Sequence, residues 1–394
     1  MNDLPSDFDE RIDRREVPAL KTHQIVLGAD GMDLFPAGVA DMDFRVAPPI
    51  LEAMRKRLEH GIFGYETLPS GLMEALTSWL EMRHDWRVGQ DQMLRSPNIL
   101  NSLAMTASAF TNPGDGIIVQ PPVFFDFYDI IRENNRELVA NPLLLKNGRY
   151  EMDFTGLEKL AALPTTRMLF LCNPHNPVGR VWTKDELCRI NDICIKNNVL
   201  VVSDEIHADI IFPGHNFTPF ASISDTAALN SVTCLSPAKS FNIAACCSSF
   251  MVVADEGLRT RLKAENSRLT VNKNNAFASV AMEAAYLEGG PWLDAVIEYL
   301  CGNLKLVRER LSEIPGVALI EPEGTFLLWI DFRGLGLAPD ELNPFLREQA
   351  KWATTRGQAF GAEGNGFARL NIACRRQALD EALQQLAHAI TARG

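Results

Sequence analysis

Short apolar runs alternate with helix-like patterns through the middle of the chain. One helix-like stretch follows the breaker-rich segment NPHNPVG (Asn173–Gly179). It begins after Thr183, which can cap a helix, and carries apolar residues every three or four positions. A strand, a helix and a strand within about 35 residues form a βαβ unit, and such units build parallel sheets. The apolar runs that we expect as strands are Gly116–Gln120, Arg167–Cys172, Val199–Ser203, Ser231–Leu235 and Ser248–Ala254.

The pattern changes after Gly289 and Gly290. Pro291 suits the first turn of a helix, and apolar residues three to four apart continue from there to Leu311. This spacing predicts a long amphipathic helix that leads into a second domain. The apolar runs beyond it are Val317–Glu321, Thr325–Phe332 and Phe367–Ala373.

The predicted fold class is α/β, with a mainly parallel sheet between helices in a large domain and a smaller α+β domain after it. The length of 394 residues agrees with two domains, because a single core stops growing at about 250–300 residues. We expect residues 1–45 to form an N-terminal arm that packs with the small domain. Residues 46–288 then form the large domain and residues 289–394 the small one.

Composition excludes several classes of function. The net charge is −12 without a basic cluster, which disfavours binding to nucleic acid or to an anionic membrane. The N-terminus is charged and lacks an apolar signal region, and no apolar run approaches the ~20 residues of a membrane span. The eight cysteines show no metal-binding spacing, so we expect no metal site and free thiols in a reducing cytoplasm.

Three polar residues follow three of the predicted strands. Asn176 lies in the loop after the second strand, Asp204 directly follows the third, and Lys239 comes just after the fourth. Ligands of open parallel sheets bind beyond the carboxyl ends of the strands, so these side chains can converge there. Each alone has an ordinary explanation, as a turn former, a helix cap or a surface charge. Together they match pyridoxal phosphate, which needs a lysine for a Schiff base, an aspartate for the ring nitrogen and an asparagine for the ring oxygen.

A phosphate site would complete this set. Ser96 can cap a helix in which Pro97 is the first residue, and a helix start offers unpaired N–H groups to an anion. Ser236, shortly before Lys239, can add a hydroxyl. A helix that is merely capped and packed in the core explains the first pattern equally well.

The motifs NPHNPVG, SDEIH (Ser203–His207) and SPAKSFN (Ser236–Asn242) resemble the fold type I pyridoxal-phosphate enzymes of the class I/II aminotransferase superfamily. The likeness covers nearly the whole chain. The segments that resemble the cystathionine β-lyase or carbon–sulfur lyase branch more narrowly are Phe8–Arg15, Ala40–Phe44, Phe63–Tyr65, Asp204–His207, Lys239–Ile243 and Arg369–Asn371.

The resemblance implies a catalytic pair and a set of ring contacts. Lys239 would bind the cofactor covalently, and Asp204 would keep the pyridine nitrogen protonated. Asn176 and His207 would lie on the side of the ring oxygen or orient Asp204, and Phe124 would stack on the ring.

It also implies the phosphate and substrate contacts. Ser236 and the backbone at Ile99 and Leu100 would bind the phosphate, and Tyr65 would reach it from a neighbouring subunit, which implies a homodimer. Arg369 would hold the substrate carboxylate through a bidentate fork. Without the resemblance, Arg369 on a strand reads equally well as part of a structural ion pair.

The chain departs from the family at some of these places. Phe124 stands where the branch usually has tyrosine, so that stacking survives but a hydroxyl is lost. Ala238 stands where a second hydroxyl is common. Arg356 replaces a usual proline, and we expect it to add a charge beside the pocket.

Two reactions fit the same residues. A carbon–sulfur β-lyase would convert an S-substituted cysteine to a thiol, pyruvate and ammonia, and His207 together with the segment Phe8–Arg15 favours this reaction. An aminotransferase is the alternative, and a catalytically silent cofactor-binding protein stays open. A nicotinamide dehydrogenase would share the sheet, but no GxGxxG follows a strand here.

Overall fold

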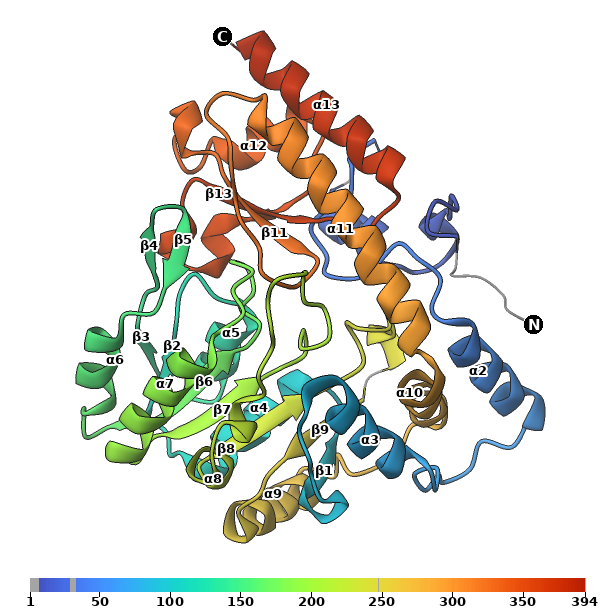
Figure 1. Ribbon diagram of the computed structural model, residues 1–394, viewed down its shortest axis with the longest axis vertical. Helices are drawn as coiled ribbons and strands as arrows, with labels where there is room; N and C mark the ends of the chain where they lie inside the picture. Colours follow the sequence, from blue (N-terminus) through green and yellow to red (C-terminus); the bar gives the residue numbers. More distant parts are fainter. Residues whose placement is uncertain (1–6, 29–32, 247, 394) are drawn as a thin grey trace.

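The computed structural model describes residues 7–28, 33–246 and 248–393. A seven-stranded sheet forms the larger, lower part of the molecule, and a second sheet lies above it (Figure 1). The strand order of the large sheet is β1-β9-β8-β7-β6-β2-β3. From β8 to β3 the strands are parallel, whereas β9 runs antiparallel to both β8 and β1. The strands are β1 Met93–Ser96, β2 Gly116–Val119, β3 Glu137–Ala140, β6 Thr166–Cys172, β7 Leu200–Asp204, β8 Ser231–Leu235 and β9 Ser249–Val252.

Helices cover both faces of this sheet because its strands are apolar on both sides. Met168 and Phe170 of β6 pack with α4, α5 and α9, whereas the alternating Leu169 and Leu171 pack with α6, α7 and α8. A two-stranded ribbon of β4 Leu144–Lys146 and β5 Arg149–Glu151 lies at one end. The helices of this part are α2 Pro48–His60, α3 Leu72–His84, α4 Ile99–Phe110, α5 Asp126–Glu133, α6 Phe154–Ala161, α7 Lys184–Lys196, α8 Asp225–Leu229, α9 Glu256–Arg268 and α10 Ala276–Glu288.

The second sheet has four antiparallel strands in the order β10-β11-β13-β12. The long helix α11 (Gly290–Ser312) runs from α10 to this upper part, with Pro291 in its first turn as the sequence predicts (Figure 1). The remaining elements of this part are β10 Ala318–Ile320, β11 Leu327–Asp331, α12 Leu342–Glu348, β12 Thr355–Arg356, β13 Phe367–Asn371 and α13 Arg376–Arg393.

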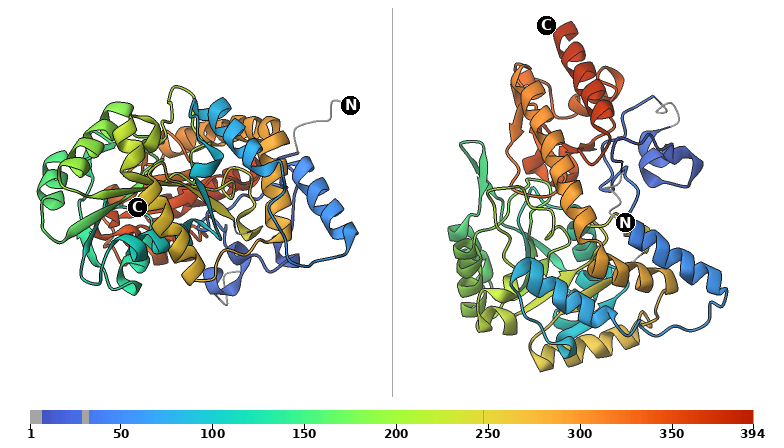
Figure 2. Two further views of the ribbon diagram at one scale, coloured as in Figure 1. Left: turned by 90° about the horizontal axis from the view of Figure 1, so that it is seen from below. Right: turned by 45° about the vertical axis from the view of Figure 1, so that its right-hand side comes forward.

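The N-terminal arm, which includes α1 (Gln24–Leu27), lies beside the upper part (Figure 2, right). Backbone hydrogen bonds join Ala37 to Ala353 and to Asn371, and the rings of Phe35 and Trp352 pack together. These contacts agree with an arm that packs with the small domain. The three domain boundaries themselves stay predictions.

The predicted strands and the α/β class are confirmed, with ends that differ by one or two residues. One local prediction is wrong. Ser96 is not a helix cap but the last residue of β1, where it pairs with Ser249. Asn98 caps α4 instead, because its Oδ1 accepts a hydrogen bond from the backbone N–H of Asn101 at 2.8 Å. Cys247 lies outside the described residues.

Candidate active site

A cavity of about 260 Å³ lies beyond the carboxyl ends of β6, β7 and β8. Eight of the ten predicted site residues line it; Tyr65 and Arg369 do not. The lining residues are Ala40, Asn98, Ile99, Leu100, Phe124, Asp126, Cys172, Asn176, Asp204, Ile206, His207, Ser236, Ala238, Lys239, Ala244 and Ser248.

Asp204 is the last residue of β7 and is only 4% exposed. It lies level with Cys172 of β6, and because neighbours in register share a face, both side chains point into the cavity. Its Oδ1 accepts one backbone hydrogen bond, from Ile206 at 3.1 Å. Burial raises the pKa of Asp204 to about 7, because a single neutral donor does not offset the loss of water.

Lys239 projects into the same cavity from the loop after β8. Its Nζ donates to the backbone carbonyl of Ala40, in the N-terminal arm, at 2.6 Å. Burial, and then the positive charge of Arg369, lower the pKa of Lys239 to about 8. The amine is therefore partly neutral near physiological pH, as a nucleophile or base requires.

The first turn of α4 and two serines form one end of the cavity. Asn98, Ile99 and Leu100 line it where the backbone N–H groups of a helix start are unpaired. Ser236 Oγ donates to the carbonyl of Ser248 at 2.7 Å. The Ser248 hydroxyl is buried and has no hydrogen-bond partner among the described residues. This donor set suits an anion.

Arg369 lies behind the cavity wall and is 2% exposed. It donates to Asn176 Oδ1 at 3.0 Å, to Gly38 O at 2.7 Å and to Thr355 Oγ1 at 3.2 Å. Its Nε is buried without a partner in the described part of the chain. Burial lowers the pKa of Arg369 to about 9, so the side chain stays a cation at neutral pH. No carboxylate lies within ion-pair distance of it among those residues, which disfavours the structural ion pair.

Two further predicted residues form other parts of the wall. His207 follows β7 and packs edge-on against the ring of Phe326, and its buried Nδ1 has no partner in the described residues. Burial, and then Lys239 and Arg369, lower its pKa well below the usual value, so the imidazole is neutral. Phe124 presents its ring to the cavity and packs on Phe125.

Tyr65 does not line this cavity in the chain that the structure describes. It is fully exposed and lines a separate groove of about 650 Å³ between α2 and α10. A role for Tyr65 at the site therefore needs a second copy of the chain, and it stays a prediction.

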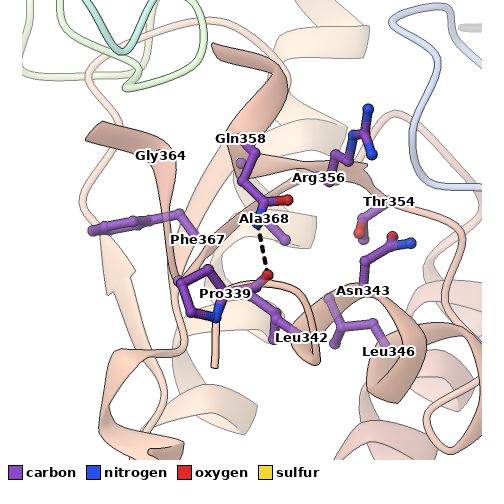
Figure 3. Close-up of a pocket in the computed structure, with 12 residues that line it drawn as sticks. Pro339, Leu342, Asn343, Leu346, Thr354, Arg356, Gln358, Gly364, Phe367 and Ala368 are labelled. Atoms are coloured by element: carbon purple, nitrogen blue, oxygen red, sulfur yellow. Dashed lines mark hydrogen bonds between the residues drawn. The ribbon is translucent and has the colours of Figure 1, made fainter. Parts of the chain in front are cut away.

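Arg356 does not line the active-site cavity, contrary to our expectation. It lies with Thr354 and Gln358 around a small hollow of the upper part, where Gln358 Nε2 donates to Pro339 O at 2.8 Å (Figure 3). The reason is strand alternation: Thr355 points to Arg369, so its neighbour Arg356 points to the other face of β12.

The cavity fits the cofactor that the sequence indicated. It combines an anion site at the start of α4 with an amine on Lys239. Within the described part of the chain, the buried Ser248 hydroxyl has no hydrogen-bond partner and the Asp204 carboxylate makes no ion pair with a cation. A phosphate, a pyridinium nitrogen and an aldehyde are the groups that these side chains would satisfy.

Eight of the sixteen lining residues were not among the predicted site residues, and four of them bring polar groups to the cavity wall. Asn98 was detectable as a cap, since asparagine is as good a cap as serine. Ser248 opens a predicted strand, and nothing local marks its hydroxyl as free. Ala40 takes part through its backbone carbonyl, and Asp126 resembles any acidic residue in the first turn of a helix.

Comparisons with known proteins extend over nearly the whole chain. Residues 38–386 match the family model of aminotransferase class I and II. The cystathionine β-lyase PatB of Bacillus subtilis is 40% identical, over 98% of this chain and 100% of that protein. A pyridoxal-phosphate-bound putative aminotransferase from Clostridium difficile is 40% identical, with a TM-score of 0.95 over 98% of this chain and 100% of its own. A pyridoxal-phosphate-bound C–S lyase from Staphylococcus hominis is 30% identical, with a TM-score of 0.89 over 98% and 99%.

Proposed function

The chain belongs to the aminotransferase class I and II family, and from this premise we propose that it is a pyridoxal-phosphate-dependent carbon–sulfur β-lyase. It would convert an S-substituted cysteine to a thiol, pyruvate and ammonia. The observation that carries the choice of reaction is the full-length similarity to a cystathionine β-lyase at 40% identity. The residues that line the cavity are compatible with either reaction of this family.

Bound pyridoxal phosphate supplies a carbonyl that joins the substrate amine and a ring that takes up electrons when the α-proton leaves. Asp204 would hold a proton on the ring nitrogen. Its carboxylate is buried with one neutral donor, so a cation beside it lowers its pKa and keeps it ionised. By holding that proton, Asp204 would keep the ring electron-poor.

Lys239 moves the proton. Its pKa, lowered to about 8, leaves a minor but larger neutral fraction near pH 7 than an ordinary lysine has, and the neutral amine accepts the α-proton of the substrate. The hydrogen bond to Ala40 O fixes where its nitrogen lies. The same amine, once protonated, is the group placed to donate to the departing sulfur.

Arg369 orients the substrate through its carboxylate. The guanidinium is already held by Asn176 and Gly38, and its Nε is left without a partner in the described residues. A carboxylate would satisfy that donor and offset the buried charge. These contacts keep the α-carbon next to Lys239.

The test is an assay of purified holoenzyme with L-cystathionine and with S-substituted cysteines, with and without an added keto acid. Pyruvate, ammonia and thiol formed in equal amounts without the keto acid support the lyase. Turnover that occurs only with the keto acid would overturn it and identify an aminotransferase, as the structural neighbour from Clostridium difficile is described. Cofactor binding without turnover in either case would identify a silent binding protein.

The proposal includes a homodimer in the cytoplasm. Several apolar side chains beside Tyr65 are more than half exposed, namely Leu58, Ile62, Phe63 and Leu287, which suits a surface that a second copy covers. Free thiols at Cys172, Cys194 and Cys234, among others, suit a reducing compartment. Among the described residues, no helix is both long enough and apolar enough to cross a bilayer.

Mixing two inactive variants tests whether Tyr65 acts across the interface. Lys239→Ala and Tyr65→Ala subunits, each with little activity alone, should recover about a quarter of the wild-type rate when mixed, because half of the dimers are hybrids with one intact site. A mixture that stays inactive while size-exclusion chromatography shows hybrid dimers would contradict the assignment of Tyr65.

A further inference from the structure

Asp126 has no assigned role, although its carboxylate lies in the active-site wall. It is the first residue of α5, and apart from Asp204 it is the sole acidic residue among those that line the cavity in the described part of the chain. Its electrostatic neighbours include the two cations of the site, Lys239 and Arg369. Asp126 therefore faces the space in which the substrate lies.

The Asp126 carboxylate is half-buried, and no hydrogen bond or ion pair joins its side chain to another described residue. Burial, and then the like charge of Asp129, raise its pKa. A carboxylate in this position is only partly hydrated and has no counter-ion in contact, so a cationic group beside it would be favourable.

A purely structural explanation exists, since an acidic residue in the first turn of a helix interacts well with the helix dipole. Asp129, one turn later on α5, shows what an ordinary surface position on this helix looks like. It is exposed and pairs with Arg132 at 3.2 Å. Asp126 differs because it faces the cavity and makes no such pair.

The other lining residues leave a defined place for the substituent on sulfur. Arg369 and Lys239 serve the amino-acid end of the substrate, and Asp204, Ser236 and Ser248 serve the cofactor. The wall that remains consists mainly of apolar side chains, including those of Ala40, Leu100, Phe124 and Ala244, together with the carboxylate of Asp126.

We propose that Asp126 selects S-substituted cysteines whose substituent carries an ammonium group, which forms a charge-assisted hydrogen bond with this carboxylate. This inference rests on the proposed lyase function and names the substrate class of the same site. The substituent of cystathionine has such an ammonium group, and S-(2-aminoethyl)-L-cysteine is the simplest probe that carries one. S-propyl-L-cysteine has the same chain length and no charge.

The experiment compares kcat/KM for these two probes in wild type, Asp126→Asn and Asp129→Asn. Wild type should prefer the aminoethyl compound, and Asp126→Asn should lower kcat/KM for it by about 10- to 100-fold, mainly through KM. The propyl compound should change by less than about threefold. Asp129→Asn, the matched control on the same helix, should leave the ratio unchanged.

A binding measurement adds a readout that does not depend on turnover. L-Lysine and L-2-aminoheptanoic acid are the analogues of the two probes in which a methylene replaces sulfur, so neither can undergo the elimination. Calorimetric titration of holoenzyme should show that Asp126→Asn weakens lysine by about 10- to 100-fold and leaves 2-aminoheptanoic acid unchanged. Asp126→Ser, with another residue that suits a helix start, should behave in the same way and guards against a folding defect in one variant.

The outcomes separate the two proposals. Equal losses for the charged and the neutral compound, or no loss for either, would overturn the role of Asp126. If neither S-substituted cysteine yields pyruvate, the lyase proposal fails, and the lysine titration still decides whether Asp126 binds an ammonium group.

Discussion

Asp204, the last residue of β7, and Asp209, in the loop that follows, lie close together in the chain, but the surroundings of the two carboxylates differ. The side chain of Asp209 is 9% exposed, and it meets three groups. Trp79 Nε1 donates to Oδ1 at 3.0 Å, His84 Nε2 lies 2.9 Å from the same oxygen, and Ser240 Oγ donates to Oδ2 at 2.6 Å. Burial opposes the charge of Asp209, but these partners outweigh it and lower its pKa.

Asp204 is as deeply placed and has one backbone donor, and burial raises its pKa to about 7. The difference shows how to distinguish a carboxylate with a structural role from one whose cationic partner is a ligand. Residues of the fold supply the hydrogen bonds to Asp209. Through one of these bonds Asp209 holds Ser240, the residue next to Lys239. Asp204 is satisfied only when a cation lies in the cavity.

The largest expected effect comes from Lys239, which lines the same cavity as Asp204. Lys239→Ala should lower turnover by at least ~10⁴-fold, because it removes both the covalent attachment and the base. The assay is pyruvate formation, and the visible absorption of the bound cofactor should shift as well. Lys263→Ala, an exposed position on α9, is the control. Substantial remaining activity of Lys239→Ala would rule out its catalytic role.

Asp204→Asn tests the carboxylate that awaits a cation. The substitution keeps the shape and removes the charge, so kcat should fall by about 10²- to 10³-fold while the protein still folds. Steady-state kinetics at saturating cofactor measure this. A decrease of less than about tenfold would mean that the charge of Asp204 is not needed.

Asp209→Asn tests the carboxylate whose hydrogen-bond partners are supplied by the protein. Unlike Asp204→Asn, it should affect folding stability more than catalytic rate. The NH₂ group of the amide would face N–H or O–H donors that now bind the carboxylate. The free energy of unfolding should therefore fall by about 2 kcal/mol. The rate should fall by only about tenfold, through a misplaced Ser240 and Lys239. Urea unfolding and kcat, measured on the same preparation, give both values. A loss of activity as large as that of Asp204→Asn without a loss of stability would break the comparison.

The smallest effect is a pH-dependent shift in melting temperature of the cofactor-free protein. The folded pKa of Asp204, about 7, lies above its reference value of 3.8, so its protonated form favours the fold. Its stabilising contribution is present below pH 4 and is lost as the pH rises to 7. Cofactor-free Asp204→Asn should therefore melt about 3 °C above wild type at pH 8 and level with it near pH 4.

Saturation with pyridoxal phosphate should reverse the order at pH 8, because the ring nitrogen supplies the missing cation. Scanning calorimetry of both proteins, with and without cofactor, checks this. Equal melting temperatures at pH 8 in the cofactor-free state would show that Asp204 is compensated by the protein itself.

The sequence by itself determined most of the elements and the centre of the cavity. Apolar runs predicted most strands of the two larger sheets, although not β1, β3 or β12. Thr183 predicted the start of α7, where it forms a capping box with Glu186. Both signals depend on near neighbours. The sequence also predicted that Lys239 and Asp204 meet at one edge of the sheet, and both line the cavity there, because parallel strands bring their carboxyl ends together. Their roles stay predictions.

Tertiary structure decided which polar groups are satisfied. The contact between Lys239 and Ala40, the free Ser248 hydroxyl, the direction of Arg356 and the cavity-facing carboxylate of Asp126 depend on segments far apart in the chain. The same holds for Asp204 and Asp209. Local sequence patterns do not distinguish these two aspartates, because both lie in the same short segment. The side chains that other elements bring beside each carboxylate decide which of the two still needs a hydrogen-bond partner from a ligand.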